Sequence, residues 1–170
     1  MDRKLDLFFE WLARLTAYIG GLVLLGIVIM TCISISGRAL GSAGLGLGPI
    51  PGDFELVEIG TGFAIFAFLP WCQLQRGHAT VDLLQPRFGP RLNAVIDLIS
   101  DILMSVAAIL IGWRLWQGMV DKKGYLETTF ILQFPVWISY AAALLGALVF
   151  VAVSLYCVYR SGRALSGARS

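Results

Sequence analysis

Charged residues are scarce in this chain of 170 residues: they make up 14% of it, whereas a soluble domain carries roughly a quarter. The few charges are also bunched, since 23 uncharged residues separate Arg14 from Arg38 and 32 separate Glu127 from Arg160. A helix of about 20 apolar residues crosses the hydrocarbon core of a bilayer. These long uncharged runs exclude a soluble domain and indicate an integral membrane protein.

Residues that carry chemistry are also few. His78 is the only histidine, so one chain cannot hold a haem through two histidines and is poor in zinc ligands. Cys32, Cys72 and Cys157 lie in or beside apolar segments without a C-x-x-C pair, which indicates buried hydrophobic side chains rather than a redox centre. The sequence has no G-x-x-x-x-G-K-[ST] loop, no G-x-S-x-G motif and no basic run typical of nucleic-acid binding. We therefore predict no cofactor, no metal, no nucleic-acid partner and no enzymatic activity.

Four segments are apolar enough to span a membrane, and they predict an all-α fold with a single membrane domain over residues 1–170. They are 15–36, 55–75, 94–120 and 135–159. The first exceeds the apolar core of a cleaved signal peptide, so we expect it to be retained. The third is interrupted by Asp97, Asp101 and Arg114, and its uncharged centre is too short for a core of ~30 Å. If this segment spans, Asp101, Arg114 or both are therefore expected near or within the bilayer.

Lysine and arginine are distributed unevenly between the two sides of the predicted spans. The N-terminus, the loop 76–93 and the C-terminus together carry nine, whereas the other side carries three. By the positive-inside rule, both termini and this loop face the cytoplasm. Residues 2–14 have apolar side chains at helical spacing and predict a short amphipathic helix on the membrane lipid, before the first span. Residues 80–92 predict a second interfacial segment, between the second and third spans.

Five charged residues inside or beside the spans are the most informative polar residues: Glu55, Glu58, Asp97, Asp101 and Arg114. Ionisable groups in lipid are costly and normally face protein, water or an opposite charge. Each acidic pair shares one helix face, so we expect cationic partners or hydration. Arg114 lies about 20 Å along its helix from Asp101, and we hypothesise that it meets Glu55 or Glu58 instead. Snorkelling to water, assembly against another membrane subunit and an ion pathway within the chain all stay open as interpretations.

A polar cluster follows the second span directly, in the stretch LQRGHATVDLL at 74–84. Gly77 suits the positive φ of a helix C′ position. We expect His78 to be an interfacial hydrogen-bonding residue in a tight turn, with direct ligand binding as the alternative. Asp82 can cap the following segment or pair with a nearby arginine such as Arg76.

Two stretches of the chain contain recognisable residue patterns, one after the other. Residues 63–84 contain the R-x-H-x-x-x-D pattern of Arg76, His78 and Asp82. Residues 124–150 contain a second series: Thr128, Leu132, Pro135, Trp137 and Tyr140. With four spans, cytoplasmic termini and an acidic start to the second span, the chain resembles the small, DctQ-like membrane subunit of tripartite ATP-independent periplasmic (TRAP) transporters.

The resemblance implies a scaffold subunit of the bacterial inner membrane. It would work with a large permease subunit and a periplasmic solute-binding protein in the Na⁺-driven import of carboxylate-bearing solutes, by default C4-dicarboxylates. The signature residues are then expected to serve folding and subunit docking: Arg76, Gly77, His78, Asp82, Pro135, Trp137 and Tyr140. The alternative is a stand-alone four-span exchanger of small molecules against protons, in which Glu58 alternates between proton and cation. A membrane enzyme or electron carrier is disfavoured by the shortage of ligands.

Overall fold

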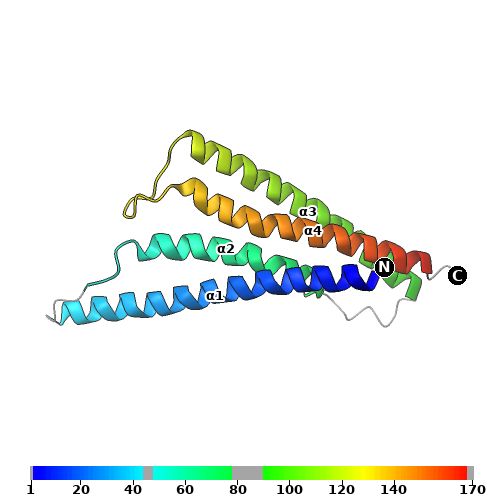
Figure 1. The fold of residues 1–170 in the computed structure, drawn as a ribbon, viewed down its shortest axis with the longest axis horizontal. Coiled ribbons are helices and arrows are strands. Elements are labelled where there is room, and N and C mark those ends of the chain that lie inside the picture. Colours follow the sequence, from blue (N-terminus) through cyan, green and yellow to red (C-terminus); the bar gives the residue numbers. More distant parts are fainter. Residues whose placement is uncertain (1, 44–47, 78–89, 168–170) are drawn as a thin grey trace.

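Four long helices account for most of the chain. The computed structural model describes residues 2–43, 48–77 and 90–167, and within them it contains α1 (Asp2–Ser42), α2 (Asp53–Leu74), α3 (Pro90–Gly124) and α4 (Val136–Gly167) (Figure 1). Each helix is long and apolar enough to cross a membrane, which confirms the all-α class and the four potential spans. His78, Asp82 and most of the expected interfacial segment at 80–92 lie outside the described residues.

The helix ends lie beyond several of the predicted span limits. α1 and α4 are the clearest cases, since they begin or end several residues outside 15–36 and 135–159. Hydropathy marks the part of a helix that can lie in hydrocarbon, whereas backbone hydrogen bonding continues into polar sequence. α3 begins at Pro90, a residue that the first turn tolerates because its missing N–H has no partner there in any helix.

α1 is one continuous helix of 41 residues, and this corrects the separate amphipathic helix predicted over residues 2–14. No glycine or proline precedes Gly20, so nothing in the sequence ends the helix early. The first turns pack against α4, because the Tyr156 hydroxyl donates a hydrogen bond to Asp6 and the Phe9 ring stacks on Tyr156 with centroids 4.4 Å apart. The polar residues of this segment therefore join α1 to another helix.

The four helices lie side by side in the order α3, α4, α2, α1 and form an open layer rather than a closed bundle (Figure 1). α4 contacts α3 along one side and α2 along the other, while α1 packs along α2 and touches α4 less. An open layer leaves much apolar surface uncovered: Leu22 of α1 and Leu103 of α3 are 72% and 65% exposed. In a membrane such faces meet lipid tails or another membrane protein.

Small residues bring α2 close to both of its neighbours. Ala64 and Ala67 of α2 are almost fully buried, and an added Cβ on Gly20 of α1 would lie 2.9 Å from the Cβ of Ala67. Gly146 approaches α2 so closely that an added Cβ would lie 2.8 Å from the backbone carbonyl carbon of Phe66. Small residues of this kind let two helix backbones approach and gain van der Waals contact, which drives helix association in lipid.

Candidate functional site

The end of α2 is closed by a Schellman motif centred on Arg76. The Arg76 N–H donates to the Gln73 carbonyl at 3.1 Å, and the Gly77 N–H donates to the Cys72 carbonyl at 2.9 Å. Arg76 has a φ of 51°, so the positive φ that we predicted for Gly77 belongs to Arg76 instead. A left-handed conformation costs a non-glycine residue roughly 1–2 kcal/mol. The side-chain contacts of Arg76 offset this strain.

The guanidinium of Arg76 connects α2 to both α3 and α4. It forms ion pairs with Asp97 and with Asp101, the second at 3.2 Å, and donates a hydrogen bond to the Ser161 hydroxyl oxygen at 2.9 Å. Asp101, only 4% exposed, also accepts hydrogen bonds from the Gln73 amide at 3.2 Å and from the Ser161 hydroxyl. We call these five residues the Arg76 network. The expected cationic partner of the Asp97–Asp101 pair is thereby confirmed.

The electrostatics of the Arg76 network favour a permanently charged guanidinium. Burial acts to lower the pKa of Arg76, but the hydrogen bond to Asp97 and the charges of Asp97 and Asp101 outweigh it, so the pKa lies above its ordinary value. Two carboxylates one turn apart repel each other, and one cation between them relieves that repulsion. Charge-assisted hydrogen bonds are the strong ones, so this network fastens three helices together at one end of the layer.

Sequence reasoning missed two members of the network. Gln73 offered a signal, because it is a polar residue at the end of an apolar span. In the structure it is 2% exposed. Ser161 offered none, since it lies 85 residues from Arg76 in sequence and looks like any polar residue near a helix end. Its role depends on α4 packing between α2 and α3.

At the opposite end of the layer, Glu55 of α2 holds the connection between α3 and α4. Its carboxylate accepts hydrogen bonds from the backbone N–H groups of Ile131 and Leu132, at 2.8 and 2.9 Å. We call residues 125–135 the outer loop. Leu126 and Gln133 of this loop have positive φ values of 52° and 53°, so its backbone is bent sharply in two places, and Glu55 helps to keep it in this shape.

Replacing Glu55 with alanine is expected to loosen the outer loop without unfolding the helices. The substitution removes the acceptor of two backbone hydrogen bonds, and bonds to a charged group contribute more than neutral ones. Hydrogen exchange at Ile131 and Leu132 should accelerate at least about fivefold in detergent micelles. Glu55→Gln, which keeps one acceptor oxygen, should have a smaller effect. Unchanged exchange in the alanine variant would show that Glu55 does not hold the loop.

Arg114 does not pair with either glutamate of α2. It donates a hydrogen bond to Gln117 of its own helix at 3.4 Å, on an exposed surface. The hypothesis that it meets Glu55 or Glu58 is wrong, because α4 lies between α2 and α3 (Figure 1). Arg114 instead remains at the surface of the layer.

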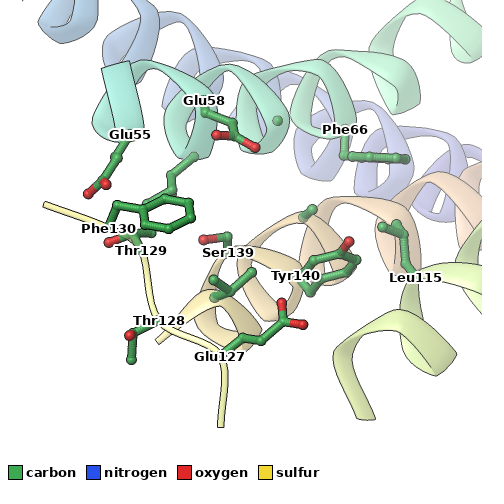
Figure 2. A pocket seen from close by; sticks show the side chains of 14 residues that line it. Glu55, Glu58, Phe66, Leu115, Glu127, Thr128, Thr129, Phe130, Ser139 and Tyr140 are labelled. Carbon is green, nitrogen blue, oxygen red and sulfur yellow. The ribbon is translucent and has the colours of Figure 1, made fainter. Parts of the chain in front are cut away.

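A cavity of about 740 Å³ opens between α2 and α4 beside the outer loop. Figure 2 shows Glu58 on α2 facing Ser139 and Tyr140 on α4, with Phe130 of the outer loop at its rim. Most of its wall is apolar and includes Ile59, Gly62, Phe66, Leu115 and Ala143. We call this cavity the outer groove.

The second group of signature residues lies around this end of the layer. Pro135 forms an isolated backbone bridge with Thr128, and Trp137 lies under Lys123, whose Nζ is 5.4 Å from the ring centroid. Tyr140 lines the outer groove. Among the described signature residues, Arg76 and Gly77 therefore lie apart from Pro135, Trp137 and Tyr140, at the opposite end of α2.

Among the residues that the structure describes, no group of three or more histidine, cysteine, aspartate or glutamate side chains could hold a metal ion. Four continuous apolar helices, fastened at one end by an ion-pair network and open to a groove at the other, define a multi-pass membrane protein.

Comparison with known proteins identifies the family of this membrane protein. The family model for tripartite ATP-independent periplasmic transporters, DctQ component, matches residues 27–164. The match covers most of the chain, which therefore belongs to the DctQ component family of TRAP transporters, a family of transporter components in the inner membrane. No curated protein and no solved structure matches the chain.

Proposed function

We propose that this chain is the scaffold subunit of a TRAP-type secondary transporter, working with a large permease subunit and a periplasmic solute-binding protein. The Arg76 network carries the scaffold role, because it fastens α2, α3 and α4 to one another through ion pairs and hydrogen bonds. The close contact at Gly146 adds a second fixed point between α2 and α4. A layer held in this way suits a fixed support for a moving neighbour.

The continuity of the helices favours a scaffold role over solute movement by this chain itself. Substrate sites near the membrane midplane are typically built from discontinuous helices, whose exposed backbone groups bind solute and ion. All four helices here are continuous, and α2 passes through Pro70 without ending. We therefore assign solute translocation to the large subunit.

The family supports a proposal for the transported solute, and the distribution of charges supports one for the orientation. We propose import of carboxylate-bearing solutes, C4-dicarboxylates by default, driven by Na⁺. The start of α1 and the end of α4 lie at the Arg76 end of the layer (Figure 1). Most of the lysines and arginines belong to the segments that we assign to that end, which supports a cytoplasmic position for it. The outer loop and the outer groove then face the periplasmic side.

Reconstitution in liposomes tests this function. With an inward Na⁺ gradient, labelled C4-dicarboxylate should be taken up only when the chain, the large subunit and the binding protein are all present. Omitting the chain should reduce uptake to the level of empty liposomes. Exchange of small cations against protons by the chain alone would instead support the stand-alone exchanger, and uptake without the chain would contradict the scaffold role.

A further inference from the structure

We infer that the outer groove receives an apolar helix of the large permease subunit that presents a lysine or arginine to Glu58. This inference rests on the proposed function for the identity of the partner and adds where and by what chemistry it docks. Three features of the groove carry it: an uncompensated carboxylate, apolar walls and an unfilled space beside Gly62.

The carboxylates around the groove differ in whether the chain itself compensates them. Glu55 accepts two backbone hydrogen bonds from the outer loop, and Glu127 forms an ion pair with Lys122 at 2.5 Å. Glu58 has no hydrogen-bond or ion-pair partner among the residues that the structure describes. One negative charge in the groove thus remains for an outside partner.

The position of Glu58 makes a cationic partner favourable. Glu58 lies about 7 Å along α2 from the start of the helix at Asp53, beside the apolar side chains of Ile59 and Phe66. An ionised carboxylate next to apolar surface at membrane depth is costly unless an opposite charge faces it. A guanidinium or ammonium on a neighbouring helix supplies this charge, and charge-assisted hydrogen bonds to carboxylates are strong.

The shape of the groove suits a helix rather than a single ion. Its volume of about 740 Å³ lies in the range of sites for whole small molecules rather than for single ions, so it has room for several side chains of a docked helix. Gly62 has no side chain and leaves open space in the groove, since an added Cβ would meet no atom within 4 Å. In membranes, helices approach each other closely at such small residues. A helix with a small apolar face and one cation would cover Gly62 and reach Glu58.

The test measures how much large subunit co-purifies with tagged variants of this chain from detergent-solubilised membranes. Glu58→Lys places like charges together, and Gly62→Leu puts a large side chain into the groove at a position where an added Cβ meets no atom within 4 Å. Each should reduce co-purification at least about tenfold, because removing one partner of a desolvated charge pair or blocking its seat has large effects. Glu58→Gln should give a smaller loss. Gly26→Leu is the matched control, since Gly26 lies on the exposed side of α1, also with no atom within 4 Å, and should leave co-purification unchanged.

The outcomes separate this inference from the proposed function. If the wild-type chain retains the large subunit and the Glu58→Lys and Gly62→Leu variants retain it equally, the inference is overturned while the scaffold role stands, and lipid fills the groove. An equal loss with Gly26→Leu also overturns it. If the wild-type chain retains no large subunit, the proposed function fails and the inference fails with it. If Gly62→Leu is not monodisperse, the Glu58→Lys variant decides the question. Its loss of co-purification should be rescued by changing a lysine or arginine of the large subunit to glutamate. Failure of every such change to rescue counts against the inference.

Discussion

Replacing Arg76 with alanine is expected to lower the free energy of unfolding by about 3 kcal/mol, the low end of the range for breaking a buried ion pair. The low end applies because the Arg76 side chain is 37% exposed and partly hydrated, whereas that of Asp101 is 5% exposed. The alanine variant removes the cation that Asp97 and Asp101 share, while Gln73 and Ser161 still donate hydrogen bonds to Asp101. Thermal unfolding in detergent, read from intrinsic tryptophan fluorescence, should show a clearly lower midpoint.

Three further variants separate the causes of that loss. Adding Asp97→Asn and Asp101→Asn to Arg76→Ala should recover part of the stability, because no unpaired charge remains. Arg76→Gly should be more stable than Arg76→Ala by about 1 kcal/mol, since glycine adopts the positive φ without strain. Arg76→Lys should fall between wild type and alanine, because an ammonium cannot bridge both carboxylates and Ser161 as a planar fork does. An alanine variant as stable as the wild type would show that the network contributes nothing to the fold.

Replacing Gly146 with leucine is expected to force α2 and α4 apart and to lower the free energy of unfolding by about 3 kcal/mol, at the upper end of the overpacking range. The atoms nearest to an added Cβ belong to Phe66: its backbone carbonyl carbon and oxygen and its Cβ, all 2.8 to 2.9 Å away. Backbone cannot rotate aside as a flexible side chain can, so the whole helix must shift. The thermal midpoint in detergent should fall accordingly.

Gly112→Leu is the matched control for this second variant. It also places leucine on a helix, but its nearest neighbour is Val151 at 3.9 Å, an ordinary contact. Leucine has a higher helix propensity than glycine by somewhat less than 1 kcal/mol, so this control should be as stable as the wild type or slightly more so. Equal destabilisation of both variants would contradict the assignment of Gly146 to a close helix contact.

The cation that pairs with Asp97 and Asp101 could be predicted only in part from the sequence. The aspartate pair at 97 and 101 predicted a cationic partner, because two carboxylates on one helix face repel. Which cation it would be did not follow, since Arg76 lies 25 residues away from Asp101 in sequence. The choice depends on the order of the helices in the layer, and apolar spans with similar lengths and hydropathy do not specify their neighbours.

The backbone of the turn after α2 is a second feature that local sequence did not predict, because it depends on contacts with other helices. Glycine is the usual residue at positive φ, so Gly77 was the natural prediction. Arg76 takes that conformation because its side chain can then reach α3 and α4, and these contacts outweigh a strain of roughly 1–2 kcal/mol. Local preference was overruled by tertiary contact.

The sequence by itself determined the membrane class, the four spans and the family resemblance. The cost of placing a charge in hydrocarbon is a local property, readable from any window of about 20 residues. Only the tertiary structure decided that the helices form an open layer, that Arg76 joins three of them, and that Glu58 faces an unfilled groove. These facts depend on contacts between residues far apart in the chain, and such contacts follow from how small residues let particular helices approach.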